Sequence, residues 1–178
     1  MAEEERTSTR VTADIAVRPG SEADLAAINE IYNYYVINTP ITFDIEPITM
    51  AQRRQWFERY ASSGRHHLLV AEAGGAVIGY ADSHQYHARH AYDTTVEVTA
   101  YCAPDATGRG IGTRLYTALF EAIKGEDVRT ALAGMTLPNP ASAALHERFG
   151  FSLYGVQHEV GRKFGRYWDI AWYEKRLA

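Results

Sequence analysis

Three glycines stand at alternate positions in the stretch APDATGRGIGTRLY, residues 103–116. Gly108, Gly110 and Gly112 leave backbone N–H groups bare, and the apolar spacing that follows predicts a helix beginning here. Bare N–H groups at the positive end of a helix bind anions, and Arg109 can add a charge-assisted contact. The stretch predicts a phosphate or pyrophosphate site, although a tight turn with glycines for packing would use the same residues. Its G-x-G-x-G spacing matches neither the dinucleotide nor the phosphate-loop motif.

Two residues near this stretch have side chains suited to proton transfer. Glu97 is the one carboxylate in TTVEVTAYCAP, a predicted strand that leads into the glycines. A carboxylate there is paired, solvent-facing or functional, and Glu97 is the candidate general base. His146 lies in a predicted helix after NPASAAL and titrates near neutrality. It is a candidate acid or base, with a plain core or surface histidine as the alternative.

Other chemistry-bearing residues are less informative. His84, His87 and His90 recur at a spacing of three, but they lie at a strand end that does not bring them together, and no cysteine is near. We therefore predict no metal site. Cys102 has no basic neighbour in sequence and is expected to be a buried strand cysteine.

The elements that must position these residues follow from the apolar periodicity. They run β-α-α-β-β-β-α-β-α-β-β, a mixed α/β order without the regular alternation of a doubly wound fold. Ser21 and Thr49 are predicted to begin the first two helices, the second running through Tyr60. Further helices are expected over 110–124 and 139–151, strands over 15–20, 94–104 and 128–137, a hairpin around Gly74-Gly75, and two final strands around a basic loop.

Composition and charge restrict the classes of protein to which this chain can belong. The 178 residues are 46% hydrophobic and 22% charged, which predicts one globular domain over 14–178 after a polar tail, residues 1–13. A net charge of -4 without a basic run argues against nucleic acid, and no apolar run reaches the roughly 20 residues of a membrane span. The single cysteine and the acidic start MAEEERTSTR indicate a soluble protein of a reducing, cytoplasmic compartment.

Residues 107–112 resemble the motif [QR]-x-x-G-x-[GA] with which the GNAT family of N-acetyltransferases binds the pyrophosphate of acetyl-CoA. Thr107 stands where the family usually has Gln or Arg. Further segments resemble, in order, the phosphinothricin and methionine sulfoximine acetyltransferase branch over about residues 15–177. They are AVRPGSEADLAAINEIYNYYV, ITFDIEP, ARHAYDTTVEVTAYCAP, LPNPASAALHERFGF and VGRKFGRYWDIAWYEKRL. The resemblance implies the GNAT fold, a mostly antiparallel sheet of about six to seven strands flanked by about four helices.

The same resemblance implies acetyl-CoA as co-substrate and assigns roles to particular residues. Glu97 becomes the base, directly or through a water, and His146 an auxiliary acid or base. The implied acetyl-CoA contacts are Ala100, Tyr101 and Cys102 for the pantetheine and thioester, Gly108, Arg109, Gly110, Ile111, Gly112 and Thr113 for the pyrophosphate, and Asn139.

For the acceptor, the resemblance implies a pocket of Phe43, Arg89, Tyr92 and Glu97, with His87 where the herbicide-detoxifying enzymes carry lysine. The expected reaction is direct transfer, in a ternary complex, to the α-amino group of phosphinothricin, methionine sulfoximine or methionine sulfone. A protein N-terminus, lysine or polyamine acceptor is the alternative, and a non-catalytic acyl-CoA-binding module is a third. Relatives also imply a homodimer, for which the aromatic C-terminal strand with Trp168 and Trp172 offers apolar surface.

Overall fold

The computed structural model describes residues 14–177, and the expected polar tail, residues 1–13, lies outside that range. The described strands form one sheet in the order β1-β2-β3-β4-β5-β7-β6. All neighbours are antiparallel except β4 and β5, which are parallel. The predicted mostly antiparallel sheet and the predicted order of elements are confirmed. The strands are β1 (Ala16–Pro19), β2 (Leu68–Ala73), β3 (Ala76–Gln85), β4 (Thr95–Cys102), β5 (Thr130–Thr136), β6 (Ser152–Lys163) and β7 (Arg166–Arg176).

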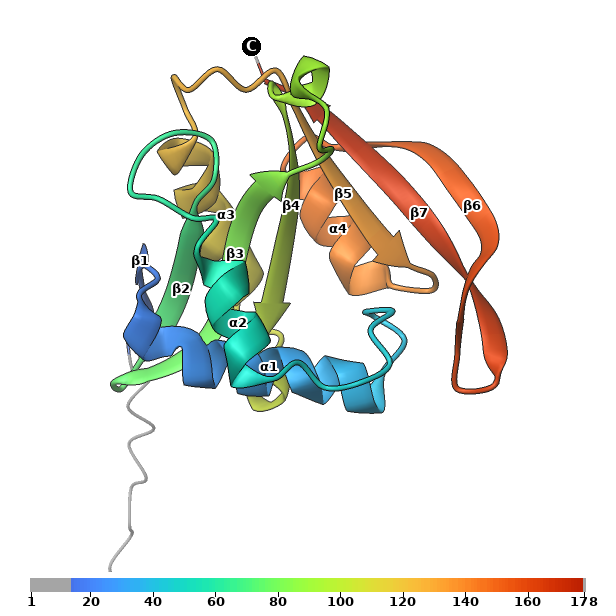
Figure 1. Ribbon diagram of the computed structural model, residues 1–178, viewed down its shortest axis with the longest axis horizontal. Coiled ribbons are helices and arrows are strands. Elements are labelled where there is room, and N and C mark those ends of the chain that lie inside the picture. Colours follow the sequence, from blue (N-terminus) through green and yellow to red (C-terminus); the bar gives the residue numbers. More distant parts are fainter. Residues whose placement is uncertain (1–13, 178) are drawn as a thin grey trace, which may run out of the picture.

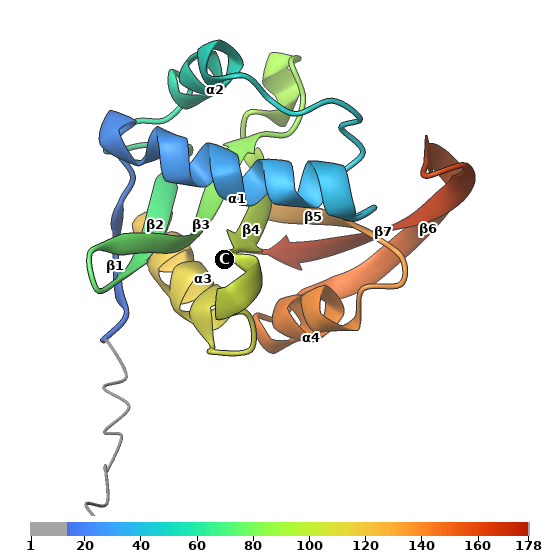
Figure 2. The ribbon, with the colours of Figure 1, turned by 90° about the horizontal axis from the view of Figure 1, so that it is seen from below.

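Helices cover both faces of the sheet. Figure 2 shows α1 and α2 on one face and α3 and α4 on the other. Successive strand residues point to opposite faces, so each strand supplies two cores. On β4, Val96 and Val98 are buried with α3, whereas Tyr101 packs against the cluster around α1. No helix within residues 14–177 is both long enough and apolar enough to cross a membrane. The helices are α1 (Leu25–Asn38), α2 (Met50–Phe57), α3 (Ile111–Ala122) and α4 (Pro140–Arg148).

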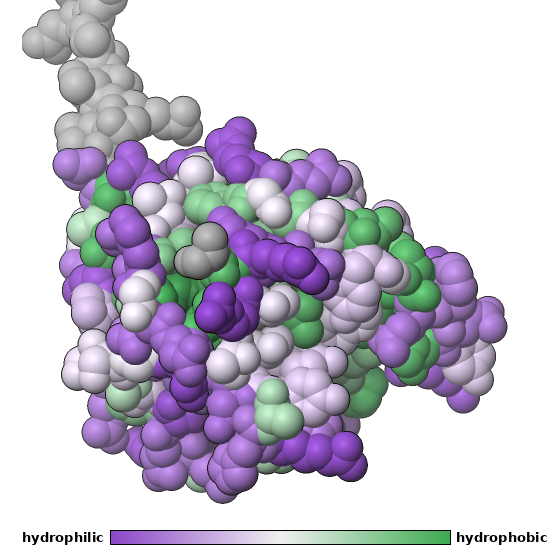
Figure 3. All heavy atoms as spheres, turned by 90° about the horizontal axis from the view of Figure 1, so that it is seen from above, coloured by the Kyte–Doolittle hydropathy of each residue, from purple (hydrophilic) through white to green (hydrophobic). Residues whose placement is uncertain are grey.

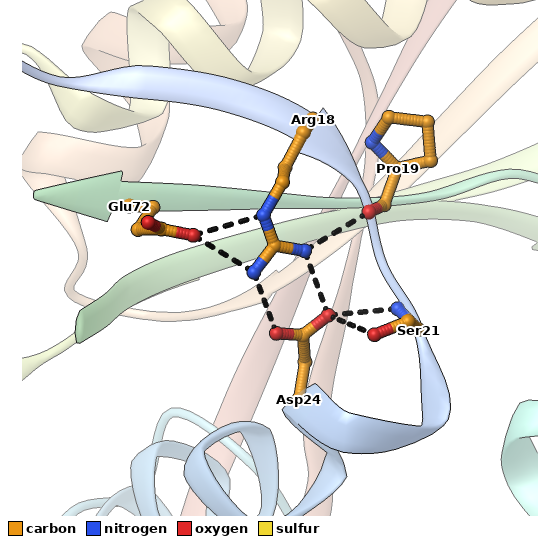
Figure 4. A network of polar contacts seen from close by, with 5 residues as sticks. All are labelled: Arg18, Pro19, Ser21, Asp24 and Glu72. Carbon is orange, nitrogen blue, oxygen red and sulfur yellow. Dashed lines mark hydrogen bonds and ion pairs between the residues drawn. The ribbon is translucent and has the colours of Figure 1, made fainter. Parts of the chain in front are cut away.

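A polar network fixes the beginning of α1 to the sheet (Figure 4). The N–H and hydroxyl of Ser21 both donate to the Asp24 carboxylate at 2.8 Å. Arg18 of β1 donates two hydrogen bonds to the same carboxylate and one to Glu72 of β2. The prediction that Ser21 begins the helix is refined, because one 3-10 turn (Glu22–Asp24) precedes α1.

The second helix begins as predicted and ends earlier. The Thr49 hydroxyl accepts a hydrogen bond from the Gln52 N–H, which caps α2. The helix ends at Phe57, before Tyr60, because the chain turns back toward β2 and the Ala61 N–H donates to the His66 carbonyl.

The sheet opens between its two parallel strands. Pairing of β4 with β5 begins at Thr95 opposite Thr130 and ends at Glu97 opposite Leu132. Beyond Glu97, β4 continues beside β3 and β5 continues beside β7, so the two strands diverge (Figure 1). Glu97 therefore lies where the sheet begins to separate.

The hairpin of β6 and β7 twists away from the rest of the sheet (Figure 1). Its large exposed apolar side chains are Leu153, Tyr154, Val160, Phe164 and Tyr167. Figure 3 shows apolar surface where this hairpin leaves the body of the protein. The hairpin thus presents both an outer strand edge and apolar surface.

Candidate active site

A cavity of about 710 Å³ occupies the gap between β4 and β5, and α3 and α4 form its other walls. We call it the β4–β5 cavity. Of the ten residues predicted to contact acetyl-CoA, nine line it, and only the exposed Arg109 does not. The nine are Ala100, Tyr101, Cys102, Gly108, Gly110, Ile111, Gly112, Thr113 and Asn139. Tertiary structure thus brings a strand, a loop and two helix starts to one hollow.

The glycines in the loop before α3 serve two different purposes. Gly108 and Gly110 have φ of 75° and 74°, in the left-handed region that favours glycine, and a Cβ on either would meet no protein atom within 4 Å. Both therefore face open space at the start of α3. A Cβ on Gly112 would lie 3.1 Å from Leu145 Cδ2, so Gly112 lets α3 and α4 pack closely. An open backbone at a helix start fits a pyrophosphate group.

Thr107, where the motif departs from the family pattern, turns toward its own loop. Its hydroxyl donates to the Pro104 carbonyl at 3.3 Å. The backbone at 108–113 is consequently left to provide the anion contacts.

The β4 segment that lines this cavity has an unreactive cysteine. Burial raises the pKa of the Cys102 thiol, so the thiol stays protonated near neutral pH. Its carbonyl accepts a hydrogen bond of 2.7 Å from the Tyr35 hydroxyl. Cys102 is a half-buried wall residue of the cavity, and is less buried than the sequence predicted.

Glu97 faces the opposite side of β4, into a second cavity of about 340 Å³ under α2. We call this hollow the α2-side cavity; Arg53, Asp82, His84, Glu97, Thr99 and Tyr101 are among its lining residues. Burial is the main cause that raises the pKa of Glu97; the neighbouring His84 lowers it, and the charge of Asp82 raises it. Thr99 and Tyr101 line both cavities, so the two hollows are adjacent at these residues, near Glu97.

His146 lines the β4–β5 cavity and is only 5% exposed. Its Nδ1 lies 2.7 Å from the Ser142 carbonyl, which can only accept, so Nδ1 carries the proton. Nε2 then accepts from the Tyr116 hydroxyl at 3.0 Å. Burial lowers the pKa of His146, which makes the neutral imidazole dominant near pH 7. Glu97 and His146 thus line different cavities.

The predicted acceptor residues are distributed more widely. Phe43 packs against Gly161 of β6, and Arg89 and Tyr92 lie on the exposed β3–β4 connection. None of these three lines either cavity, whereas Glu97 does. The His87 ring lies 4.8 Å from the Tyr92 ring.

The three regularly spaced histidines have separate partners. His84 bonds to Asp82, His87 packs on Tyr92, and His90 contacts Asp93 at 3.3 Å. Within residues 14–177, no group of three His, Cys, Asp or Glu side chains is arranged to hold a metal ion.

The sequence did not single out several residues that the structure places at the site. Tyr116 occupies the buried stripe of a helix and resembles any core aromatic in sequence. Arg53 is 3% exposed between the rings of Tyr32 and Trp56, and it is the buried residue of α2. The neighbouring sequence does not indicate that either residue lies at the site, because the residues that surround Tyr116 and Arg53 come from distant segments.

A sheet that opens between β4 and β5, with one cavity on each side of β4, is an arrangement that can hold an acyl donor near a carboxylate, as in an acyltransferase. The sequence model described as "Acetyltransferase (GNAT) domain" matches residues 17–172, and the chain belongs to this family. It is an N-acetyltransferase, as the resemblance implied.

Individual relatives agree along most of the chain. A phosphinothricin N-acetyltransferase of Streptomyces coelicolor is 52% identical over 168 residues, covering 93% of this chain and 98% of that protein. An N-acetyltransferase of Streptomyces griseus is 51% identical over 174 residues, covering 95% and 90%. The crystal structure of a phosphinothricin acetyltransferase from Sinorhizobium meliloti in complex with AcCoA superposes with a TM-score of 0.87 at 34% identity, covering 92% of this chain and 89% of that one.

Proposed function

We propose that this enzyme transfers the acetyl group of acetyl-CoA to the α-amino group of phosphinothricin, methionine sulfoximine, methionine sulfone or a similar amino-acid analogue. The observation that carries the proposal is that the two cavities share Thr99 and Tyr101 as lining residues, near Glu97. An acyl donor on one side of β4 and an amine on the other can then react directly. Relatives named for phosphinothricin and for methionine sulfoximine and sulfone support this acceptor class.

The β4–β5 cavity is the proposed acetyl-CoA site. The backbone at 108–113, including Arg109, holds the pyrophosphate, Asn139 and the Ala100–Cys102 segment hold the pantetheine arm, and a backbone N–H of that segment stabilises the thioester oxygen as it becomes negative. Bound acetyl-CoA supplies the carbonyl carbon that the amine attacks. The protonated thiol of Cys102 argues against an acetylated cysteine and for direct transfer.

Glu97 is the proposed base. It removes a proton from the acceptor ammonium, so that the amine nitrogen can bond to the acetyl carbon while the carbon–sulfur bond breaks. The nitrogen loses its second proton as the amide forms, and this proton neutralises the leaving thiolate. His146 is the auxiliary acid or base for this step, and its hydrogen bond with Tyr116 orients the imidazole.

Phe43, Arg89 and Tyr92, together with Glu97, are the proposed acceptor contacts. Among the described residues the Arg89 guanidinium has no hydrogen-bond or ion-pair partner, which suits it to the carboxylate or phosphinate of a small acid. We expect Arg89→Ala to raise the KM for the acceptor by at least tenfold with little change in acetyl-CoA affinity.

The enzyme is also proposed to act as a homodimer in the cytoplasm and to confer resistance to such analogues. The apolar surface of the β6–β7 hairpin supports the dimer, and the lone thiol Cys102 suits a reducing compartment. Light scattering after size exclusion tests the oligomeric state directly.

The acceptor proposal is tested with a panel of phosphinothricin, methionine sulfoximine, methionine sulfone, spermidine and a lysine peptide, with release of the CoA thiol as readout. We expect turnover of at least one amino-acid analogue and weak turnover of the last two. Preference for spermidine or the peptide would establish the alternative acceptor class. Acetyl-CoA binding without turnover of any acceptor would indicate a non-catalytic module.

The base is tested by Glu97→Gln, with Glu121→Gln on the exposed face of α3 as control. The Glu97 variant should lose on the order of 100-fold or more in kcat/KM. Its Kd for acetyl-CoA should stay within about twofold. Equal turnover by Glu97→Gln and the wild-type enzyme would show that Glu97 is not the base.

A further inference from the structure

Asp82, His84 and Glu97 form a row of titratable side chains on the α2-side face of the sheet. Asp82 and His84 stand two residues apart on β3, so they share one face. His84 Nδ1 lies 2.6 Å from Asp82 Oδ1, and its Nε2 lies 3.9 Å from Glu97 Oε2. The second approach is close because His84 and Glu97 are direct cross-strand partners. The imidazole therefore lies between two carboxylates.

Asp82 is held rigidly at the inner end of this row. Its side chain is only 4% exposed. One oxygen contacts His84 and the other accepts a hydrogen bond of 2.8 Å from the Thr99 hydroxyl. A buried carboxylate needs such partners, and the strongest partner available here is a protonated imidazole.

Other titratable groups act on the row from neighbouring segments. Burial and Arg59 lower the pKa of His84, whereas Asp82 and Glu97 raise it, and the net direction is upward. His66, in the connection before β2, is coupled to His84, and the Tyr60, Tyr80 and Tyr101 hydroxyls feel the charge of Asp82. Tyr116 on α3 and Tyr154 on β6 feel the charge of Glu97. Both the Asp82 and the Glu97 carboxylates lie within 4 Å of a ring nitrogen of His84.

We propose that Asp82 and His84 are a positioning pair for Glu97, in which Asp82 holds the imidazolium of His84 against Glu97 and keeps that carboxylate ionised and oriented toward the acceptor amine. The inference rests on the proposed role of Glu97 as base. Neither Asp82 nor His84 touches the reacting atoms. Their effect is confined to the pH range in which His84 carries its charge.

The first test is the pH dependence of kcat/KM between about pH 5.5 and 9.5 for His84→Gln and for Asp82→Asn. In His84→Gln, loss of the positive charge beside Glu97 should move the acid limb upward by about one pH unit, the size expected for a unit charge about 4 Å away in a solvated site. In Asp82→Asn the upward shift should be smaller, because the Asp82 charge itself raises the pKa of Glu97. On the acid limb kcat/KM should fall by up to about tenfold, and at pH 9 it should stay within about threefold of wild type. A purely structural role would lower kcat/KM by the same factor at every pH, and that result would overturn the proposal.

A matched control comes from a second histidine–aspartate pair outside the site. His158 Nδ1 lies 3.0 Å from Asp169 Oδ2 on the exposed hairpin. His158→Gln removes the same kind of contact and should leave the acid limb unchanged. Acetyl-CoA affinity and thermal unfolding of each variant report whether the fold is retained.

The second test does not depend on turnover. The nitrogen-15 NMR titration of His84 is followed in the wild-type enzyme and in Glu97→Gln. Coupling is reciprocal, so removal of the Glu97 charge should lower the pH at which His84 titrates by about one unit. An unchanged midpoint would overturn the inference even if Glu97→Gln is inactive. Full activity of Glu97→Gln would instead overturn the proposed function.

Discussion

The Tyr116 hydroxyl lies 3.0 Å from Nε2 of His146, and both side chains are buried between α3 and α4. With the Ser142 carbonyl on the other ring nitrogen, this contact gives the imidazole one tautomer and one orientation. The sequence indicated His146 as a candidate acid or base, but it gave no indication of a role for Tyr116.

Tyr116→Phe should lower the free energy of unfolding by about 1–3 kcal/mol, because the buried Nε2 of His146 loses the hydrogen bond from the Tyr116 hydroxyl. Denaturant unfolding measures this cost. Adding His146→Leu to Tyr116→Phe should cost less than the sum of the two single changes, because the double variant has no unsatisfied partner. Additive costs would show that the two side chains do not interact.

Gly110→Ala should weaken acetyl-CoA binding by about tenfold or more, since a Cβ at φ 74° projects into the open space before α3. Gly125→Ala is the matched control, because Gly125 has φ 85°, has no protein atom within 4 Å of its Cβ position, and follows the other end of α3. Both variants should lose about 1 kcal/mol of stability from backbone strain. Calorimetric titration measures the Kd of each variant for acetyl-CoA. Equal Kd values for the two variants would show that Gly110 is not part of the phosphate site.

Asp24 should make stability depend on pH in the acid range. The Arg18 guanidinium and Ser21 lower the pKa of Asp24 to about 2, below its unfolded value near 3.9. The ionised carboxylate therefore favours the folded state above about pH 4, and this contribution disappears as the pH falls from 4 to 2. We expect Asp24→Asn to be about 1–2 kcal/mol less stable than wild type at pH 7, with the difference vanishing near pH 2. A constant difference in urea unfolding across that range would contradict this assignment.

Gly161→Ala should displace Phe43, because a Cβ on Gly161 would overlap the Phe43 ring. Overpacking of this kind costs about 1–3 kcal/mol. Lys163 Nζ also donates a hydrogen bond of 2.8 Å to the Thr42 carbonyl, so the loop that carries Thr42 and Phe43 has little freedom to move away. If Phe43 contacts the acceptor, KM for the acceptor should rise severalfold while the Kd of acetyl-CoA is unchanged.

Gly155→Ala on the same strand provides the comparison for this variant, because its Cβ would meet nothing within 4 Å. It should leave both constants near their wild-type values. An unchanged KM for the acceptor in Gly161→Ala would show that Phe43 does not contact the acceptor.

Local patterns explain the parts of the fold that the sequence predicted. Each of these features depends on residues close together in the sequence. They are the Gly74-Gly75 turn between β2 and β3, the Thr49 cap and the glycines before α3. The end of α2 was misjudged because a distant backbone contact, from Ala61 to His66, turns the chain. The surroundings of the acceptor residues could not be predicted for the same reason, since Phe43 packs against Gly161, which is more than half of the chain away in sequence.

The sequence by itself determined the order of elements, the bare backbone at 108–112 and the presence of Glu97 in an apolar strand, because each depends on periodicity or on backbone freedom at one place. Tertiary structure decided that β4 and β5 part after Glu97, that Tyr116 meets His146, and that His84 lies opposite Glu97. These relationships depend on strand register and helix packing. A shift of one residue in register would turn every side chain of a strand to the other face, and no local stretch of sequence specifies that register.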